Sequence, residues 1–415
     1  MTRSLPSLAG APWFTDPAVR AVFEAVGRDR DDIRIVGGAV RNALMGVAVA
    51  DIDFATRASP EIVAERAHAA GLKVVPTGIE HGTQTVVADG SGFEITTLRE
   101  DIETDGRRAV VRFGRDWRVD ASRRDFTVNA LYVDSTGKVH DPLGGYADLV
   151  AGKIRFIGEA DRRIAEDRLR VLRFFRFHAQ YGKSSLDRDG LLASIRARHD
   201  LRQLSAERVG REMRLLVTAK GACDALTIMQ DSGILQIVFG GIGYLAAIRR
   251  LQAFEVSCEA TPEIPLRLAA IGCRVAEDVT RLVERLRLSN AERNRMLAAV
   301  AATAVFVGRP GRTEARKSLY RLGQETYQDG VALAFSQGRD EVADAYWCDL
   351  YSLPENWAAP TFPLGGRDVL AATGLRGPAV GTILKQIEDW WIENDFGPDE
   401  SALRNRLQQI GAASQ

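Results

Sequence analysis

The sequence lacks several features that mark whole classes of protein. It has only four cysteines, Cys223, Cys258, Cys273 and Cys348, and no C-x-x-C pair. This scarcity argues against both a zinc site and a disulfide framework, and it favours a reducing compartment. No apolar run is long enough to span a bilayer, and the first residues lack the apolar core of a signal peptide. We therefore expect a cytoplasmic protein without a membrane partner.

Net charge is also absent, because 55 basic residues balance 55 acidic ones. The balance is uneven along the chain, since residues 153–214 carry 16 basic and 9 acidic side chains. A local basic excess can contact a polyanion such as RNA, although a solvated helical surface has the same composition. The length of 415 residues is too great for a single ordinary core and predicts two to four domains.

Strand and helix signals separate along the chain. Short β-branched runs at 33–36, 51–56, 72–75, 84–88, 93–97 and 109–113 predict strands, with a helix beginning at Ser59-Pro60. After about Gly158 the strand signals vanish and apolar residues recur at helical spacing. We predict an α+β fold, in which a small mixed-sheet head is followed by helices. The expected domains are a head at 1–157, a neck at 158–217, a body at 218–310 and a tail at 311–415.

A glycine pair and an aspartate pair stand close together in IVGGAVRNALMGVAVADIDF. Gly37 and Gly38 end a predicted strand and open a helix, where a phosphate can approach the backbone amides. Arg41 follows in the first turn of that helix, within reach of a triphosphate. Asp51 and Asp53 are two apart on the next predicted strand, so both project from one face. Paired carboxylates of this kind suit Mg²⁺, and two such ions can drive phosphoryl chemistry.

A second motif is DASRRDFTVNALYVD, residues 120–134. The guanidinium groups of Arg123 and Arg124 can neutralise phosphates. Asp125 and Asn129 can hydrogen-bond ribose hydroxyls, and they share a face if the segment is helical. An exposed charged turn is the alternative interpretation of the same residues.

A third motif, EDRLRVLRFFRF at 166–177, places Asp167 and Arg170 three residues apart on a predicted helix. Cytosine and adenine both present an amino group beside a ring acceptor, which a carboxylate and a guanidinium can bond together. Uracil and guanine present the opposite order, and unpaired groups there cost about 1–3 kcal/mol each. On spacing alone, however, an ion pair between Asp167 and Arg170 is the simpler interpretation. The later segment 204–217, with Glu207, Arg208 and Glu212, is expected to brace this helix.

Together these motifs resemble the class II CCA-adding enzymes and bacterial poly(A) polymerases, within the polymerase-β-like superfamily. The resemblance is dense from about 33 to 217 and faint after 360. The usual GGxVRD becomes GGAVRN here, so Asn42 replaces an aspartate and puts one local contact in doubt. The resemblance implies that Glu94 is a third catalytic carboxylate beside Asp51 and Asp53. It also implies base selection by Asp167 and Arg170.

The resemblance further implies a reaction and its partners. An RNA 3′-hydroxyl would attack the α-phosphate of CTP or ATP, with Mg²⁺ as cofactor and the 3′ end of tRNA as substrate. A poly(A) polymerase, or an enzyme that adds only A or only CC, would share these motifs. A non-catalytic RNA-binding protein is a third possibility, although both metal-binding aspartates are intact. The oligomeric state stays open.

Overall fold

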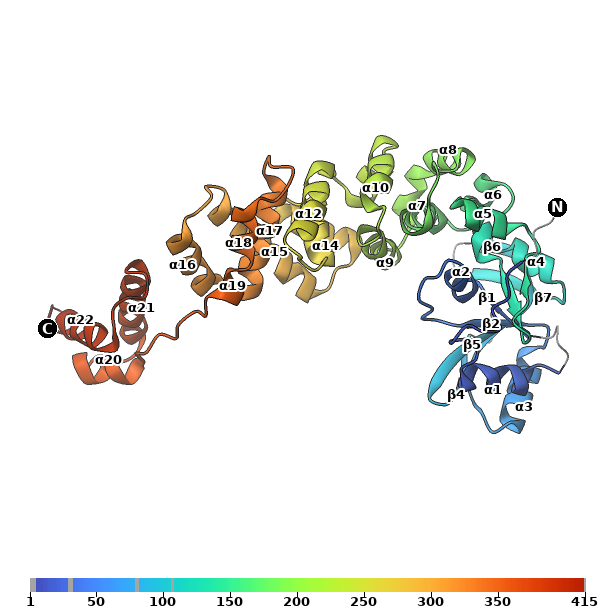
Figure 1. Cartoon of the computed structure of the whole chain (residues 1–415), viewed down its shortest axis with the longest axis horizontal. Helices are drawn as coiled ribbons and strands as arrows, with labels where there is room; N and C mark the ends of the chain where they lie inside the picture. Colours follow the sequence, from blue (N-terminus) through green and yellow to red (C-terminus); the bar gives the residue numbers. More distant parts are fainter. Residues whose placement is uncertain (1–4, 29–32, 79–81, 106–107, 414–415) are drawn as a thin grey trace. The chain divides into compact units, whose positions relative to one another are not determined.

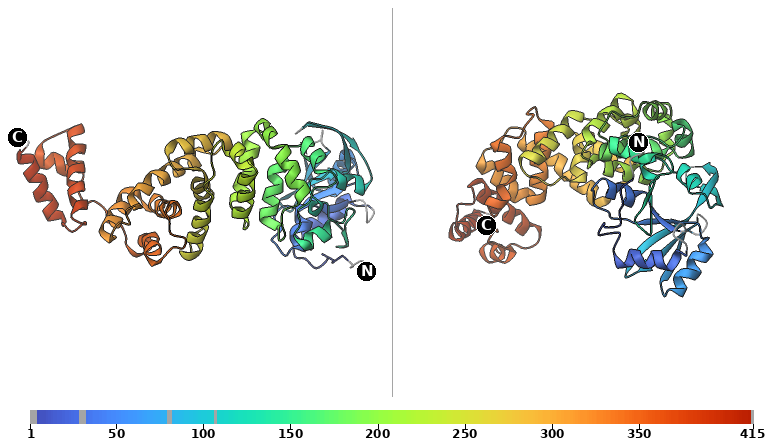
Figure 2. Two further views of the ribbon diagram at one scale, coloured as in Figure 1. Left: turned by 90° about the horizontal axis from the view of Figure 1, so that it is seen from above. Right: turned by 45° about the vertical axis from the view of Figure 1, so that its right-hand side comes forward.

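The computed structural model describes residues 5–28, 33–78, 82–105 and 108–413. The chain divides into two compact units, Met1–Val238 and Phe239–Gln415. The first unit contains all the strands of the described residues together with helices, whereas the second is built of helices (Figures 1 and 2). The predicted combination of a mixed-sheet head with a helical remainder is confirmed.

A seven-stranded mixed sheet forms the centre of the head, with the strand order β3-β4-β5-β2-β1-β8-β9. Strands β2 and β5 run parallel, and the other neighbours in this sheet are antiparallel. Strands β6 and β7 pair separately as an antiparallel ladder. The bounds are β1 Ile33–Val36, β2 Asp53–Thr56, β3 Lys73–Gly78, β4 Thr83–Ala88, β5 Ser91–Thr97, β6 Arg99–Asp105, β7 Arg108–Phe113, β8 Tyr132–Asp134 and β9 Val139–His140.

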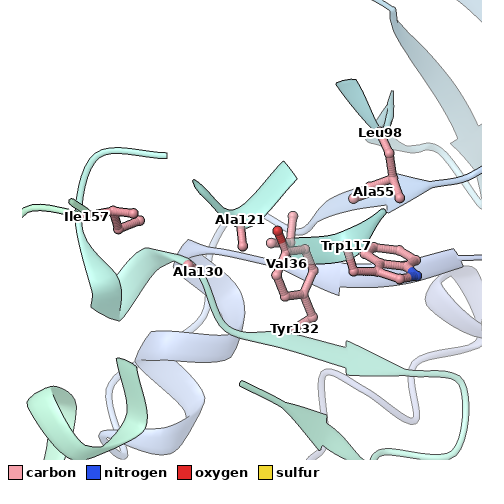
Figure 3. Close-up of a cluster of buried hydrophobic side chains, with 8 residues drawn as sticks. All are labelled: Val36, Ala55, Leu98, Trp117, Ala121, Ala130, Tyr132 and Ile157. Atoms are coloured by element: carbon pink, nitrogen blue, oxygen red, sulfur yellow. The ribbon is translucent and has the colours of Figure 1, made fainter. Parts of the chain in front are cut away.

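Both faces of the sheet are covered by apolar packing. On one face, α1 (Pro17–Val26) and α3 (Pro60–Ala69) lie against the strands, and Phe54 of β2 contacts Phe23 and Phe93. On the other face, α4 (Trp117–Ser122) contributes to a buried cluster with β1, β2 and β8 (Figure 3). That cluster contains Val36, Ala55, Leu98, Trp117, Ala121, Ala130, Tyr132 and Ile157. Alternation along β2 therefore places Asp53 on the face of Ala55, opposite Phe54.

The sequence located most, but not all, of the strands. The predicted strand at 33–36 has the observed bounds of β1, while β6, β8 and β9 were not predicted. The prediction that Asp51 and Asp53 share a strand is wrong, because β2 begins at Asp53 and Asp51 lies in the preceding segment. Only residues 53–56 pair with β1 and β5, so the ladder ends there.

Helices account for the rest of the first unit. The short α2 (Gly38–Leu44) follows β1 directly. The others after β9 are α5 Gly145–Ala151, α6 Ala160–Glu166, α7 Leu169–Tyr181, α8 Arg188–Arg196, α9 Ala206–Val217, α10 Ala222–Asp231 and α11 Ile234–Phe239, with 3₁₀ turns at Thr127–Asn129 and Arg198–Gln203. Helix α7 packs against both α9 and α10, which makes it the centre of the helical part of this unit.

The second unit is helical throughout its described residues, as the sequence predicts. Its helices are α12 Leu245–Ser257, α13 Ile264–Gly272, α14 Ala276–Leu286, α15 Asn290–Phe306, α16 Arg312–Leu322, α17 Gln324–Gln337, α18 Ala345–Tyr351, α19 Leu353–Asn356, α20 Gly366–Thr373, α21 Pro378–Glu393 and α22 Glu400–Ala413. Residues 310 and 311, where the expected body and tail meet, lie between α15 and α16. None of the helices in the described ranges is both long and apolar enough to cross a membrane.

The prediction from the cysteine content that argued against disulfide bonding is wrong. Cys258 and Cys348 form a disulfide, although they are separated by 90 residues in the sequence. Cys258 caps α12 and Cys348 lies in α18, and both of these helices pack against α17. Contact through a third helix leaves no signal in cysteine spacing, which is why the sequence missed the pairing. The bond also removes the argument from cysteine content for a reducing compartment.

Candidate functional site

An open pocket of about 470 Å³ lies in the first unit, on the face of the sheet opposite α1 and α3. All residues predicted to bind nucleotide line it, as does Asp53. The lining residues are Gly37, Gly38, Arg41, Asp53, Arg123, Arg124, Asp125, Asn129, Asp167, Arg170, Arg173, Arg176 and Phe177. The three sequence motifs, which span residues 37–177, therefore meet in one cavity.

Of the three carboxylates predicted for the metal site, Asp53 lines this pocket, whereas Asp51 and Glu94 do not. Asp53 and Glu94 are register partners on the parallel strands β2 and β5, and alternation puts both side chains on one face. Burial raises the pKa of Asp53 above its usual value, and the charges of Glu94 and Asp51 raise it further, against the opposing effect of Arg124. Like charges held this close favour a bound cation, and hard oxygen ligands suit a divalent metal. Within the described ranges, however, no group of three acidic, histidine or cysteine side chains is already arranged as a metal centre.

The glycine turn has a backbone that depends on glycine. Gly37 adopts φ 77° and ψ −120° at the N-cap of α2, a conformation that L-residues rarely adopt. The position that a Cβ would take on Gly37 lies 3.7 Å from Nη1 of Arg124, which places the turn beside that guanidinium. The Gly37 amide itself donates to the carbonyl of Leu131 at 3.1 Å, fixing the turn to the segment before β8.

Asp120 holds the two adjacent arginines of the second motif. Its carboxylate, which is 1% exposed, pairs with Arg123 at 2.7 Å and with Arg124 at 3.2 Å. It also accepts a hydrogen bond from the Tyr132 hydroxyl at 2.8 Å. One carboxylate therefore faces two guanidinium groups, and the surplus positive charge lies at the pocket wall, where a phosphate would be attracted.

A chain of polar contacts runs across the floor of the pocket. Arg41 donates to Asn129 Oδ1 at 2.5 Å, and Asn129 Nδ2 donates to Asp125 Oδ1 at 2.9 Å. Asp125 Oδ2 in turn accepts from Arg173 Nη2 at 2.6 Å. The segment forms a 3₁₀ turn at 127–129 and not an α-helix, yet Asp125 and Asn129 do lie together.

Arg41 is more enclosed than its predicted contact with a triphosphate requires. It is 7% exposed, and its guanidinium stacks 4.3 Å from the ring centroid of Tyr181 and donates to the hydroxyl of that residue at 3.0 Å. Burial lowers the pKa of Arg41 from its usual value. It donates to oxygens of Asn42, Asn129 and Tyr181, which are uncharged. Arg41 thus brings a positive charge to the pocket without a hydrogen bond to a carboxylate, and it orients Asn129.

The prediction of a continuous helix at 166–177 is wrong. Asp167 breaks the helix, since α6 ends at Glu166 and α7 begins at Leu169. Its Oδ1 accepts from the Leu169 amide at 3.1 Å, so the carboxylate caps the first turn of α7. The interpretation of Asp167 and Arg170 as an ion pair with each other is not supported, because each has another partner. Asp167 pairs with Arg208 at 2.7 Å, and Arg170 pairs with Glu166 at 2.6 Å.

Helix α9 braces the start of α7, as the sequence suggests. Arg208 of α9 pairs with Asp167, and Glu212 pairs with Arg176 at 2.5 Å and lies 3.8 Å from Arg173. Glu212 is buried, at 5% exposed. These contacts fix the side chains on the pocket-facing side of α7 without placing α9 itself in the pocket.

Sequence reasoning missed three residues that shape the site. Asp120 pairs with both adjacent arginines, the Tyr181 hydroxyl accepts a hydrogen bond from Arg41, and Phe177 lines the pocket beside Arg173 and Arg176. Asp120 was detectable, because it stands three and four residues before the arginines that it pairs with. Tyr181 was not, since 140 residues separate it from Arg41.

Comparison with known proteins gives this geometry a context. A model of the poly A polymerase head domain matches residues 33–155. The mitochondrial CCA tRNA nucleotidyltransferase 1 of Mus musculus is 31% identical over 408 residues, which cover 95% of this chain and 91% of that protein. A CCA-adding enzyme of Geobacillus thermodenitrificans is 38% identical over 215 residues, covering 51% of this chain and 52% of that protein.

Among solved structures, the chain is similar to the CCA-adding enzyme of Bacillus stearothermophilus in complex with CTP. The TM-score is 0.74 at 25% sequence identity, and the alignment covers 96% of this chain and 98% of the other. The similarity thus extends over both units of the chain and is not confined to the head.

Proposed function

The chain belongs to the family of CCA-adding tRNA nucleotidyltransferases, and we propose that it adds C and A nucleotides to the 3′ end of tRNA without a nucleic-acid template. The substrates are CTP and ATP. In each cycle the 3′-hydroxyl oxygen of the RNA attacks the α-phosphorus, the bond to the β-phosphate oxygen breaks, and pyrophosphate leaves. The observation that carries the proposal is the convergence of carboxylates, guanidinium groups and the Asp167–Arg170 pair in one pocket.

The metal site is assigned to Asp51 and Asp53, with Glu94 assisting. Mg²⁺ at this position supplies charge neutralisation for the triphosphate and activation of the attacking hydroxyl. Burial raises the pKa of Asp53, and the charges of Glu94 and Asp51 raise it further; a cation bound here would relieve that repulsion, which supports the assignment. Asp53 is the first residue of β2 and the register partner of Glu94, and Asp51 lies two residues earlier, in the segment before the strand.

The nucleotide is assigned to other residues that line the pocket. Gly37, Gly38 and Arg124 are assigned to the triphosphate, together with the positive charge of Arg41. Asp125 and Asn129 are assigned to the ribose. Arg173 holds Asp125 and Arg41 holds Asn129, so both groups are oriented before a nucleotide arrives. Pre-ordered polar groups of this kind cost little reorganisation on binding.

Base selection is assigned to Asp167 and Arg170. Each side chain is fixed by a different partner, Arg208 for Asp167 and Glu166 for Arg170, and both line the pocket, one as an acceptor and the other as a donor. That order matches the amino group and ring nitrogen of C and A, and it leaves unpaired groups against U and G. The fixed carboxylate and guanidinium would therefore select the base in place of a nucleic-acid template.

Each of the predicted domains is assigned a role. The helical tail at 311–415 is assigned to tRNA binding, the neck at 158–217 to base selection, and the head at 1–157 to the metal and the triphosphate. The body at 218–310 connects them. The cytoplasm is the proposed location.

The experiment that tests the function uses three tRNA transcripts, which lack the last three, the last two or only the last of the CCA nucleotides. The protein is expected to complete all three with CTP and ATP together, and to add a single A to the last transcript. Long A tracts without C would instead identify a poly(A) polymerase, which the head-domain match keeps as the second candidate. Failure to extend one class of transcript would identify an enzyme that adds only CC or only A.

A further inference from the structure

Asn42 lies between two groups of opposite hydrogen-bonding character. Its Oδ1 accepts from Arg41 Nη2 at 2.8 Å and from Arg41 Nε at 3.1 Å. Its Nδ2 donates to the backbone carbonyl of Ala48 at 3.1 Å. A guanidinium can only donate and a carbonyl can only accept, so the residue between them must do both. An amide meets that requirement, and a carboxylate does not.

The two groups that Asn42 joins belong to different parts of the site. Arg41 donates a hydrogen bond to Asn129, which lines the pocket. Ala48 lies in the segment 45–52, which connects α2 to β2 and delivers Asp51 and Asp53 to the edge of the pocket. Inside that segment the structure has no helix or strand. Among the described residues, the backbone hydrogen bonds between this segment and α2 come near its beginning, where the amides of Met45, Gly46 and Val47 donate to carbonyls of Arg41, Asn42 and Ala43.

We propose that Asn42 is a positioning residue, whose amide fixes the metal-carboxylate segment 45–52 to the arginine of the nucleotide pocket. An aspartate, the residue that the related motif carries here, would keep the bond to Arg41 and would repel the Ala48 carbonyl. An alanine would lose both bonds. The two substitutions therefore separate the contact with Ala48 from the contact with Arg41.

The first test measures hydrogen exchange of the metal-free protein. Peptides that cover residues 45–52 are compared in the wild type, N42D and N42A. Losing one hydrogen bond should speed local opening by about fivefold in both variants. Asn290→Asp is the matched control, because Asn290 is an exposed helical asparagine in the second unit, and it should leave this segment unchanged. Exchange at the wild-type rate in N42D would overturn the proposal, and N42A tests the same bond should N42D not fold.

The second test is kinetic and rests on the proposed function. In N42D the Mg²⁺ concentration for half-maximal tRNA extension should rise by about threefold or more, because a looser segment binds the metal less tightly. The KM for ATP should change less, since Arg41 keeps its acceptor. A raised KM with unchanged Mg²⁺ dependence would show that Asn42 acts on Arg41 alone and would overturn the proposal. Because exchange is measured without substrate, it decides the role of the amide even if the chain extends no tRNA.

Discussion

Arg208 of α9 pairs with Asp167 at 2.7 Å, across 41 residues of sequence. The pairing fixes the direction of the Asp167 carboxylate, which lines the same pocket as Arg170, and Arg170 is held separately by Glu166. Base selection in this account therefore depends on a residue that touches no nucleotide.

The first prediction concerns Arg208. Arg208→Ala should free Asp167 and lower the preference for CTP over UTP, because the acceptor is no longer held against the cytosine amino group. The loss in the ratio of kcat/KM values should be roughly tenfold, within the 1–3 kcal/mol range expected for such a contact. Arg211→Ala removes an exposed charge from the same helix and serves as the control. An unchanged ratio in Arg208→Ala would show that Asp167 needs no brace.

The second prediction uses the two adjacent glycines. Gly37→Ala should destabilise the protein by about 1–3 kcal/mol, because φ 77° strains any residue with a Cβ although space for the atom exists. Gly38→Ala lies in a helix at ordinary φ, with its nearest neighbour at 3.8 Å, and should not lower the melting temperature. Thermal unfolding of the two variants measures the difference. Equal melting temperatures would contradict the described turn.

The third prediction concerns a buried ion pair in the second unit. Glu255 accepts from Arg267 Nε at 3.0 Å and from Nη2 at 2.6 Å, and both side chains are less than a tenth exposed. Glu255→Ala leaves the guanidinium without this partner and should cost about 3–5 kcal/mol of unfolding free energy. Denaturant titration measures the loss. Asp161→Ala breaks the exposed pair with Arg196 and should leave the midpoint nearly unchanged.

The fourth prediction concerns the disulfide. Denatured protein prepared without reductant should contain two titratable thiols, from Cys223 and Cys273, and reduced protein should contain four. Reduction removes a constraint across 90 residues, worth about 4.6 kcal/mol in the chain-entropy model, so the melting temperature should fall. A Cys258→Ser, Cys348→Ser double variant should match the reduced protein and ignore reductant. Four thiols in the unreduced protein would contradict the bond.

Local signals in the sequence located most of the elements and most of the residues that line the pocket. Periodicity gave β1 its bounds, and short motifs named the residues that line the pocket. Contacts that depend on topology were beyond such signals. Asp53 and Glu94 are neighbours because β5 lies beside β2 in the sheet. The sequence does not reveal that strand order, so Glu94 was predicted only from the resemblance. The break at Asp167 was missed because helical spacing continues through it, whereas its carboxylate caps the next helix.

The contacts between distant segments explain the other differences. Arg173 holds Asp125 from 48 residues away, so the role of that arginine was visible only after α7 had been placed against the head. The disulfide depends in the same way on α17, against which both of its helices pack. Neither arrangement follows from propensity or from spacing.

The carboxylate edge of the pocket is the centre of the account, and Asp53→Asn tests it most directly. The substitution keeps the shape of the side chain and removes the charge that faces Glu94 and Asp51. Extension of a tRNA transcript lacking its CCA end is measured with CTP, ATP and Mg²⁺, together with binding of the same tRNA. We expect extension to fall by roughly a thousandfold while tRNA binding is retained. A loss in rate of this size is typical when a group that stabilises the transition state electrostatically is removed. Extension by Asp53→Asn at the wild-type rate would contradict the account.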